Sequence, residues 1–205
     1  MYKHVLKPLI DFITSLILLI LISPVFVVIM IALSFSNRGN PFFRQQRPGK
    51  NEVLFYILKF KTMNDIRDDN GLLLDDSERL TKLGRVIRKT SMDELPQLLN
   101  VLMGQMSFIG PRPLLIKYLP HYTERERIRH TVRPGITGLA QVSGRNLLNW
   151  NDRLELDVEY VENLSFLLDV KIFLKTVMKV ITAKDIVVDP QSIMPSLESE
   201  RSNQK

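Results

Sequence analysis

The sequence predicts a mainly helical α+β protein with one small β hairpin, held at one face of a membrane as a monotopic protein. Three observations lead to this fold class. Residues 12–35 carry no charge, residues 42–60 combine turn formers with strand formers, and most later segments repeat apolar residues at helical spacing. We expect residues 1–36 to form a membrane anchor, 37–188 a domain on the cytoplasmic face, and 189–205 a polar, disordered tail.

Composition limits the partners that this chain can have. A net charge of +6 favours anionic partners, namely nucleic acid, acidic lipid or a phosphorylated substrate. The chain contains no cysteine, which excludes a disulfide framework and a thiolate metal site. The three histidines, His4, His121 and His130, show no metal-ligand spacing. The 205 residues leave room for one domain of about 150 residues beside the anchor.

The first apolar segment is long enough to cross a bilayer. Residues 12–35 are 24 residues without a charge, which as a helix would measure about 36 Å. Ser23 and Pro24 stand at its centre, where a proline kinks a helix. Basic residues flank the segment on both sides: Lys3 and Lys7 before it, and Arg38, Arg44, Arg47 and Lys50 after it. The positive-inside rule places such residues in the cytoplasm, and a straight span cannot satisfy both flanks.

Two topologies are compatible with this segment. A kinked single span is the more frequent outcome in membrane proteins, because re-entrant helices are rare. The basic flanks favour the alternative, a re-entrant helix that enters the membrane, bends at Pro24 and returns to the cytoplasmic face. We expect the re-entrant form, with the Ser23 hydroxyl satisfying a backbone carbonyl that the proline frees.

Short strands and a helix follow the anchor. Residues 42–43 and 53–60 read as strands of a hairpin. Residues 64–76 are acidic and contain a turn, so we expect a solvated loop and assign it no role. Residues 77–89 show the spacing of a helix with one apolar face.

The most informative run is residues 91–99, which carries two adjacent carboxylates, Asp93 and Glu94, at a predicted helix start. Basic residues precede it three and four positions apart, and cations with backbone N–H groups can hold a phosphate while a carboxylate attacks it or binds a metal. The alternative is a capping box between Ser91 and Glu94. Pro96 argues against that box. If Ser91 were the N-cap, Pro96 would be the fifth residue of the helix, and a proline cannot donate the backbone hydrogen bond that this position normally makes. The spacing alone leaves the two interpretations even.

Three later loops present arginines on stiff backbone. Arg112 lies between prolines, Arg133 precedes Pro134 and Gly135, and Arg145 follows a glycine. A rigid loop with a guanidinium suits bidentate phosphate recognition, although each loop taken alone could be a structural turn with a surface arginine. Together the three favour an anion site.

Two helices are predicted near the end of the chain. Residues 150–163 form a mixed amphipathic pattern that includes Asp157. Residues 164–184 are mostly apolar but carry lysines at intervals of four, Lys171, Lys175 and Lys179. A basic stripe opposite an apolar face predicts a helix in the membrane interface, and the alternative is a packed helix with solvated lysines.

Several stretches resemble one family in fixed order: KFKTM at 59–63, RKTSMDELPQL at 88–98, MSFIGPRP at 106–113, RHTVRPGITG at 129–138 and AQVSGRN at 140–146. The chain resembles bacterial monotopic phosphoglycosyl transferases, also called bacterial sugar transferases, over residues 7–187. Its overall look is closest to the minimal, PglC-type catalytic form of that family.

The resemblance implies a two-step transfer at the cytoplasmic face of the bacterial inner membrane. Asp93 would attack the sugar-bearing phosphate of a UDP-sugar and release UMP, and polyprenyl (undecaprenyl) phosphate would then take the phospho-sugar. Glu94 would bind Mg²⁺. The PglC-type form implies UDP-N,N'-diacetylbacillosamine as donor and a start of glycoconjugate or N-glycan assembly. By their chemistry, six residues are candidates for binding the substrate phosphates: Lys59, Arg88, Arg112, Arg145, Arg133 and Asp157.

Other functions remain open at this point. The same reaction could use another UDP-N-acetyl-hexosamine. A chain of a different class would be a non-catalytic basic module that binds acidic lipid or RNA, which explains the charge and the anchor but not the paired acids beside arginine loops. A multi-spanning polyprenyl transferase is disfavoured, because there is a single long apolar segment. We expect a UDP-sugar, a polyprenyl phosphate and membrane lipid as partners, and no nucleic acid.

Overall fold

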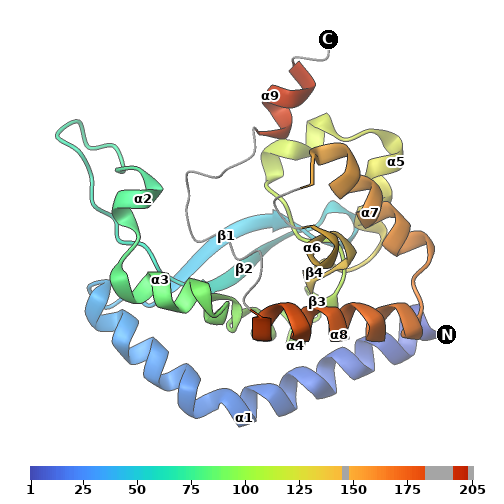
Figure 1. The fold of residues 1–205 in the computed structure, drawn as a ribbon, viewed down its shortest axis with the longest axis horizontal. Helices are drawn as coiled ribbons and strands as arrows, with labels where there is room; N and C mark the ends of the chain where they lie inside the picture. The colour runs from blue at the N-terminus through green and yellow to red at the C-terminus, as the bar shows by residue number, and fades with distance from the viewer. Residues whose placement is uncertain (145–147, 183–195, 203–205) are drawn as a thin grey trace.

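The computed structural model describes residues 1–144, 148–182 and 196–202 (Figure 1). A long first helix runs beneath a compact body of short helices and two small sheets. The elements are α1 (Lys7–Ser36), β1 (Phe42–Pro48), β2 (Leu54–Phe60), α2 (Asp76–Arg79), α3 (Lys82–Lys89), α4 (Gln97–Leu102), β3 (Ser107–Ile109), α5 (Glu124–Arg127), β4 (Gly135–Thr137), α6 (Leu139–Ser143), α7 (Trp150–Glu162), α8 (Phe166–Thr182) and α9 (Leu197–Ser202). The predicted mainly helical α+β class is confirmed.

Helix α1 is continuous through Pro24 and bends along its length, so that its middle bows away from the body (Figure 1). A proline has no N–H to donate to the carbonyl four residues earlier, which here is that of Ile20. The Ser23 hydroxyl donates to this same carbonyl at 2.8 Å. The hydrogen bond expected of Ser23 beside Pro24 is therefore present, and the role of this bend in a re-entrant helix stays a prediction.

Both ends of α1 are attached to the body. At the first end, Lys7 Nζ lies 2.7 Å from Asp169 Oδ2 of α8, and both side chains are buried. Just past the other end, Asn37 Nδ2 donates to the Lys61 carbonyl at 2.7 Å. Among the described residues, Tyr2–Ser36 is the one helical stretch with the length and hydropathy to cross a membrane, and little of its most apolar part is buried.

The predicted hairpin is confirmed, although β1 is longer than expected. Strands β1 and β2 pair antiparallel, with Phe42 opposite Phe60. The fully buried side chain of Asn100 ties α4 to β2, because it accepts from the Leu58 N–H at 3.0 Å and donates to the Tyr56 carbonyl at 2.8 Å. Helix α4 is thus held beside the strand that carries Lys59.

The helix expected over residues 77–89 is split into α2 and α3. Leu80 is extended because it bridges to Met63, and this breaks the helical backbone. Thr81 then starts α3, accepting from the Gly84 N–H at 2.9 Å as an N-cap. A Cβ on Gly84 would lie 2.0 Å from the Thr62 carbonyl oxygen, so only glycine permits this close approach of α3 to the chain after β2.

A second, parallel sheet was not predicted. Strands β3 and β4 have three residues each and pair Ser107 with Gly135 and Ile109 with Thr137. The loop after β3 lies beside the start of β4, because the Gly135 N–H donates to the Pro111 carbonyl at 2.9 Å, and a Cβ on Gly110 would lie 2.6 Å from the Arg133 carbonyl oxygen. The loops that carry Arg112 and Arg133 therefore lie side by side.

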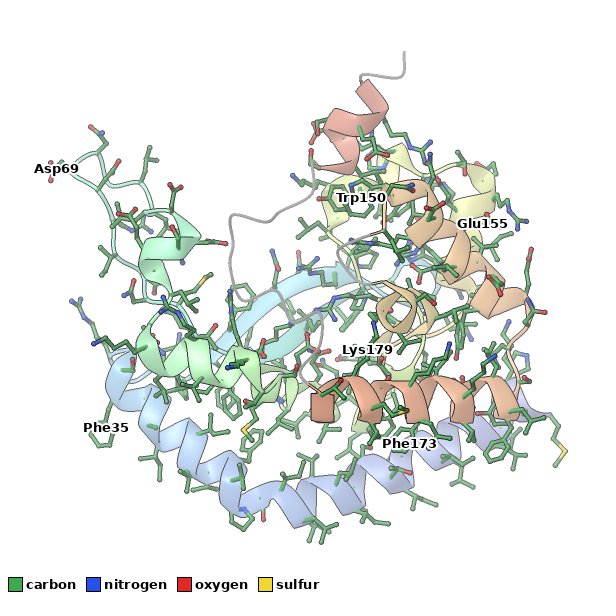
Figure 2. The ribbon with its side chains drawn as sticks, viewed as in Figure 1. Phe35, Asp69, Trp150, Glu155, Phe173 and Lys179 are labelled. Atoms are coloured by element: carbon green, nitrogen blue, oxygen red, sulfur yellow. The ribbon has the colours of Figure 1, made fainter. Side chains whose placement is uncertain are left out.

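The last helices close the structure. Helix α7 follows the predicted range closely, and α8 buries Ile172 completely while Lys171 and Lys175 are exposed. Phe173 and Lys179 project from opposite sides of α8 (Figure 2). The amphipathic pattern of α8 is therefore present, and its place in the membrane interface stays a prediction.

The expected disordered tail was wrong for residues 197–202, which form α9. Leu197 is completely buried in a cluster with Leu114, Tyr118 and Trp150. This single apolar contact supplies the core packing that the polar composition of the tail did not suggest. Residues 189–195 and 203–205 of the predicted tail lie outside the described residues.

Candidate active site

The two adjacent carboxylates lie on a tight turn that precedes a helix. Asp93 and Glu94 belong to the 3₁₀ turn Met92–Glu94, and α4 begins only at Gln97, with Pro96 as its N-cap. Ser91 has φ 56°, in the left-handed region, and its side chain makes no capping hydrogen bond. The capping-box interpretation is therefore wrong, and Pro96 loses no helical hydrogen bond.

Glu94 is held by two cations. Its Oε1 accepts from Lys59 Nζ and from Arg112 Nη2, each at 2.7 Å. Burial opposes ionisation of this carboxyl, but the charges of Arg112 and Lys59 outweigh it and keep the pKa of Glu94 well below its usual range. Glu94 is therefore a permanent anion at physiological pH.

Asp93 behaves differently although it is adjacent in sequence. Burial raises its pKa, and the negative charge of Glu94 adds to this effect, against the opposing charges of Lys59 and Arg88. The Lys59 ammonium lies 4.0 Å from Asp93 Oδ2, too far for a hydrogen bond. Burial therefore outweighs the charges of the nearby cations in setting the direction of this pKa shift.

Of the other predicted residues, Arg88 and Asp157 line the same cleft as the two carboxylates. Arg88 Nε donates to Thr62 Oγ1 at 2.9 Å, which fixes its guanidinium beside β2. Asp157 is only 1% exposed, and its Oδ1 has no hydrogen-bond partner among the described residues. The structure thus brings together Lys59, Arg88, Asp93, Glu94, Arg112 and Asp157 around one cleft.

Two predicted residues are not part of this group. Arg133 is absent from the described lining of the cleft, and its guanidinium lies beside Gly104, so the expected phosphate contact is not supported. The reason is the pairing of β3 with β4: the Ser107 N–H donates to the Pro134 carbonyl at 2.8 Å and fixes the Arg133 loop along β3. Arg145 lies outside the described residues.

Sequence reasoning missed Arg129, which holds two parts of the site together. Its guanidinium is buried and pairs with Asp157, with Nη2 2.7 Å from Oδ2. The same Nη2 donates to the Arg112 carbonyl at 2.6 Å. The alternating charges around Arg129 in the sequence suggest a solvated surface. The only signal for its buried role in the site was its position in the stretch at 129–138 that resembles the family.

The cleft joins a basic region to an apolar one and has a volume of about 1380 Å³. Of the described residues that line it, eight are Lys or Arg and five are Asp or Glu. The apolar lining includes Leu18 and Ile22 of α1 together with Phe173 and Val180 of α8. The cleft can therefore accept an anionic group and a hydrocarbon chain at the same time.

Comparison with known proteins agrees with this geometry. Residues 2–183 match the family described as bacterial sugar transferase. The chain is 52% identical to the uncharacterized sugar transferase EpsL of Bacillus subtilis over 89% of its length and 90% of that protein. It is 40% identical to the UDP-glucose:undecaprenyl-phosphate glucose-1-phosphate transferase of Klebsiella pneumoniae, and 36% identical to the galactosyl transferase CpsE of Streptococcus agalactiae. These matches cover 85% and 88% of this chain, but only 40% and 43% of those longer proteins.

Proposed function

Because the chain belongs to the bacterial sugar transferase family, we propose that it transfers a phospho-sugar from a UDP-sugar to a polyprenyl phosphate. One observation carries this proposal: the Asp93–Glu94 pair lies among cations in a cleft whose lining also includes an apolar wall from α1 and α8. The cations suit the diphosphate of a nucleotide sugar, and the apolar wall suits the hydrocarbon of a lipid acceptor. The name of the Klebsiella relative describes a reaction of this kind.

The proposed reaction has two steps. A carboxylate oxygen of Asp93 attacks the phosphorus that bears the sugar, and the bond from this phosphorus to the oxygen of UMP breaks with its electron pair on UMP. The chain then holds an aspartyl phospho-sugar. An oxygen of the polyprenyl phosphate attacks the same phosphorus, which frees the Asp93 carboxylate and gives a polyprenyl diphosphate sugar.

The neighbouring residues prepare this attack. Lys59 lies within 4.0 Å of both carboxylates and Arg112 pairs with Glu94, so their charges can act on a phosphate that lies against the pair. Arg88, held by Thr62, adds a third cation. The partial desolvation of Asp93 leaves its carboxylate poorly stabilised, and a poorly stabilised anion is the better nucleophile.

Glu94 is the residue that we assign to Mg²⁺. Among the described residues no cluster of three or more His, Cys, Asp or Glu side chains could hold a metal ion unaided. Mg²⁺ is commonly held by one or two carboxylates and by substrate phosphates, and Glu94 Oε2 accepts no hydrogen bond from a described residue. When bound there, the ion would neutralise negative charge on the phosphoryl group.

The Glu94→Gln variant tests this assignment. It should raise the Mg²⁺ concentration needed for half-maximal activity, because the permanent anion is lost while the size of the side chain is kept. The measurement is a Mg²⁺ titration of UMP release, with Asp65→Gln as a control at the exposed rim of the cleft. An unchanged Mg²⁺ requirement in Glu94→Gln would remove Glu94 from the metal site.

The reaction itself is tested by UMP release from a panel of UDP-sugars with polyprenyl phosphate and Mg²⁺. The panel contains UDP-glucose and UDP-galactose, after the names of the relatives, together with UDP-N-acetyl-hexosamines and UDP-N,N'-diacetylbacillosamine. The last donor rests on the sequence resemblance alone. Binding to anionic vesicles or RNA that weakens with salt, without any nucleotide product, would instead support the non-catalytic module.

The raised pKa of Asp93 gives a pH prediction. Asp93 acts as the unprotonated carboxylate, so activity should fall as the pH drops through the pKa of Asp93. This pKa lies above the ordinary aspartate value of about 3.9. Lys59 lowers this pKa, so Lys59→Gln should move the acidic limb of kcat/KM to higher pH. Measuring kcat/KM against pH for both proteins checks the direction. A limb that stays in place in Lys59→Gln would show that another group controls it.

We further propose that α1 is re-entrant and that the body lies on the cytoplasmic face. The attachment of both ends of α1 to one body, through Lys7 and Asn37, supports this proposal. A straight span would carry one of these ends to the far side of the membrane. The bend at Pro24, with the Ile20 carbonyl satisfied by Ser23, gives the helix a way to return.

Cysteine labelling tests the topology. Because the chain has no cysteine, single cysteines replacing Lys3 and Asn40 stand on a clean background. In intact spheroplasts both sites should resist a membrane-impermeant maleimide, and both should react after the membrane is opened. Replacing Ser23 and Pro24 with Ala and Leu should straighten α1 and expose the site at position 3. External labelling of that site in the unmodified helix would establish a span.

A further inference from the structure

Thr62 connects helix α3 to the strand that carries Lys59. It follows the end of β2 by two residues and is buried. Its carbonyl oxygen accepts from the Thr81 N–H at 3.3 Å and from the Thr81 hydroxyl at 3.2 Å. Because Thr81 is the N-cap of α3, the first turn of this helix rests on the backbone just after β2.

The segment between these two threonines is closed at its base. The Asn64 N–H donates to the Arg79 carbonyl at 2.9 Å, and Arg79 Nε donates back to the Asn64 carbonyl at 2.9 Å. These bonds hold Thr62 beside Thr81, although 19 positions separate them in the chain. The place of α3 relative to β2 is therefore fixed by hydrogen bonds on both sides of the threonine pair.

The helical repeat then brings Arg88 to the side chain of Thr62. Gly84 and Arg88 are four residues apart on α3, so they lie on the same face of the helix. Gly84 lies against the Thr62 carbonyl, where no Cβ would fit. One turn later, Arg88 Nε donates to Thr62 Oγ1 at 2.9 Å.

This hydrogen bond leaves one edge of the Arg88 guanidinium available. Among the residues that the structure describes, Nη1 and Nη2 of Arg88 have no hydrogen-bond partner. With Nε occupied by Thr62, the planar fork of Nη1 and Nη2 is the edge that can bind two oxygens of a phosphate. Thr62 and Arg88 both line the cleft that contains Asp93.

A short turn connects Arg88 to Asp93. The Ser91 N–H donates to the Arg88 carbonyl at 3.0 Å, and the Glu94 N–H donates to the Ser91 carbonyl at 3.2 Å. The charge of Arg88 is among those that lower the pKa of Asp93 against the effect of burial. A phosphate bound to Asp93 would therefore lie within the field of Arg88.

We propose that Thr62 is a positioning residue, which holds Arg88 so that its Nη1–Nη2 edge binds the phosphoryl group transferred through Asp93. This inference rests on the proposed function. A guanidinium that is already oriented loses less conformational freedom when it binds a phosphate. Without the Thr62 hydroxyl, Arg88 would keep its charge and lose its fixed direction.

Equilibrium binding of UDP and of UMP to the full chain in lipid nanodiscs with Mg²⁺ tests this role. Thr62→Val keeps the size of the side chain and removes the acceptor, so it should raise the Kd for UDP about tenfold. The Kd for UMP should stay unchanged, because UMP lacks the phosphate that would be transferred. Thr62→Ser keeps the hydroxyl and should bind UDP like the wild type. Thr90→Val is the matched control, since its exposed hydroxyl bonds only to backbone carbonyls of α3.

A double variant shows whether Thr62 acts through Arg88. In an Arg88→Gln background, Thr62→Val should add nothing to the Kd for UDP. A further loss of the same size in that background would overturn the proposal, as would unchanged UDP affinity in Thr62→Val alone. An equal loss for UMP, or in Thr90→Val, would indicate a general distortion of the site and would overturn it as well.

Hydrogen exchange in the wild-type chain gives a second test that does not depend on how the variants fold. The Arg88 Nε–H, assigned by its absence in Arg88→Gln, should exchange slowly with solvent in a ¹⁵N NMR measurement, and rapid exchange would overturn the proposed positioning. Failure of the wild-type chain to release UMP from any UDP-sugar would contradict the proposed function instead, whatever the results for UDP binding.

Discussion

Asp93→Asn should abolish phospho-sugar transfer, with a loss on the order of 10⁴-fold or more, while the protein remains folded. The change is nearly isosteric and removes the nucleophilic oxygen. Among the described residues, the Asp93 side chain makes no hydrogen bond, and its nearest cation is Lys59 at 4.0 Å. Little folding energy therefore depends on its charge, and the loss should be one of chemistry.

Isotope exchange distinguishes this covalent route from direct transfer. The wild-type chain should exchange labelled UMP into UDP-sugar in the absence of any lipid acceptor, because the first step is complete without it. Asp93→Asn should lose this exchange together with turnover, whereas Asp65→Asn, at the exposed rim of the same cleft, should retain both. Exchange that strictly requires the acceptor would point to a ternary complex and remove the aspartyl intermediate.

Local patterns in the sequence predicted the elements that local chemistry determines. The kink of α1 followed from Pro24, and its hydrogen-bond repair followed from the hydroxyl of Ser23. The hairpin followed from turn formers between two strand-forming runs. Strands β3 and β4 could not be predicted in this way, because each has three residues and is stabilised by pairing with a segment far away in the chain.

The site shows the same division between chemistry and packing. Arg112 and Arg133 lie in similar proline-containing loops, yet only Arg112 reaches Glu94, because the pairing of the two loops turns Arg133 toward Gly104. The direction of the Asp93 pKa shift depends on burial, which the charges visible in the sequence do not reveal. Arg129 resembled a surface residue because its burial, too, cannot be read from the charges in the sequence.

Removing the charge of Asp157 should give the largest loss of stability. Arg129 is 2% exposed, and its Nε and Nη2 donate to Asp157 Oδ2 at 3.1 and 2.7 Å. Asp157→Asn would leave a buried guanidinium without a counter-ion. Breaking such a pair costs about 3–5 kcal/mol, a large part of the roughly 5–15 kcal/mol that stabilises a typical domain. Arg125→Met, at an exposed ion pair with Glu155, should change stability little.

A double variant separates the net worth of the pair from the penalty of leaving one charge alone. Arg129→Met with Asp157→Leu removes both charges and keeps apolar volume, so much of the stability lost in Asp157→Asn should return. Chemical denaturation of the purified proteins measures this recovery. Arg129 Nη2 also donates to the Arg112 carbonyl at 2.6 Å, so the restored double variant should still transfer phospho-sugar slowly. Full activity in the double variant would show that the ion pair stabilises the fold without positioning Arg112. If the double variant is instead less stable than Asp157→Asn, the buried ion pair itself makes a net contribution to stability.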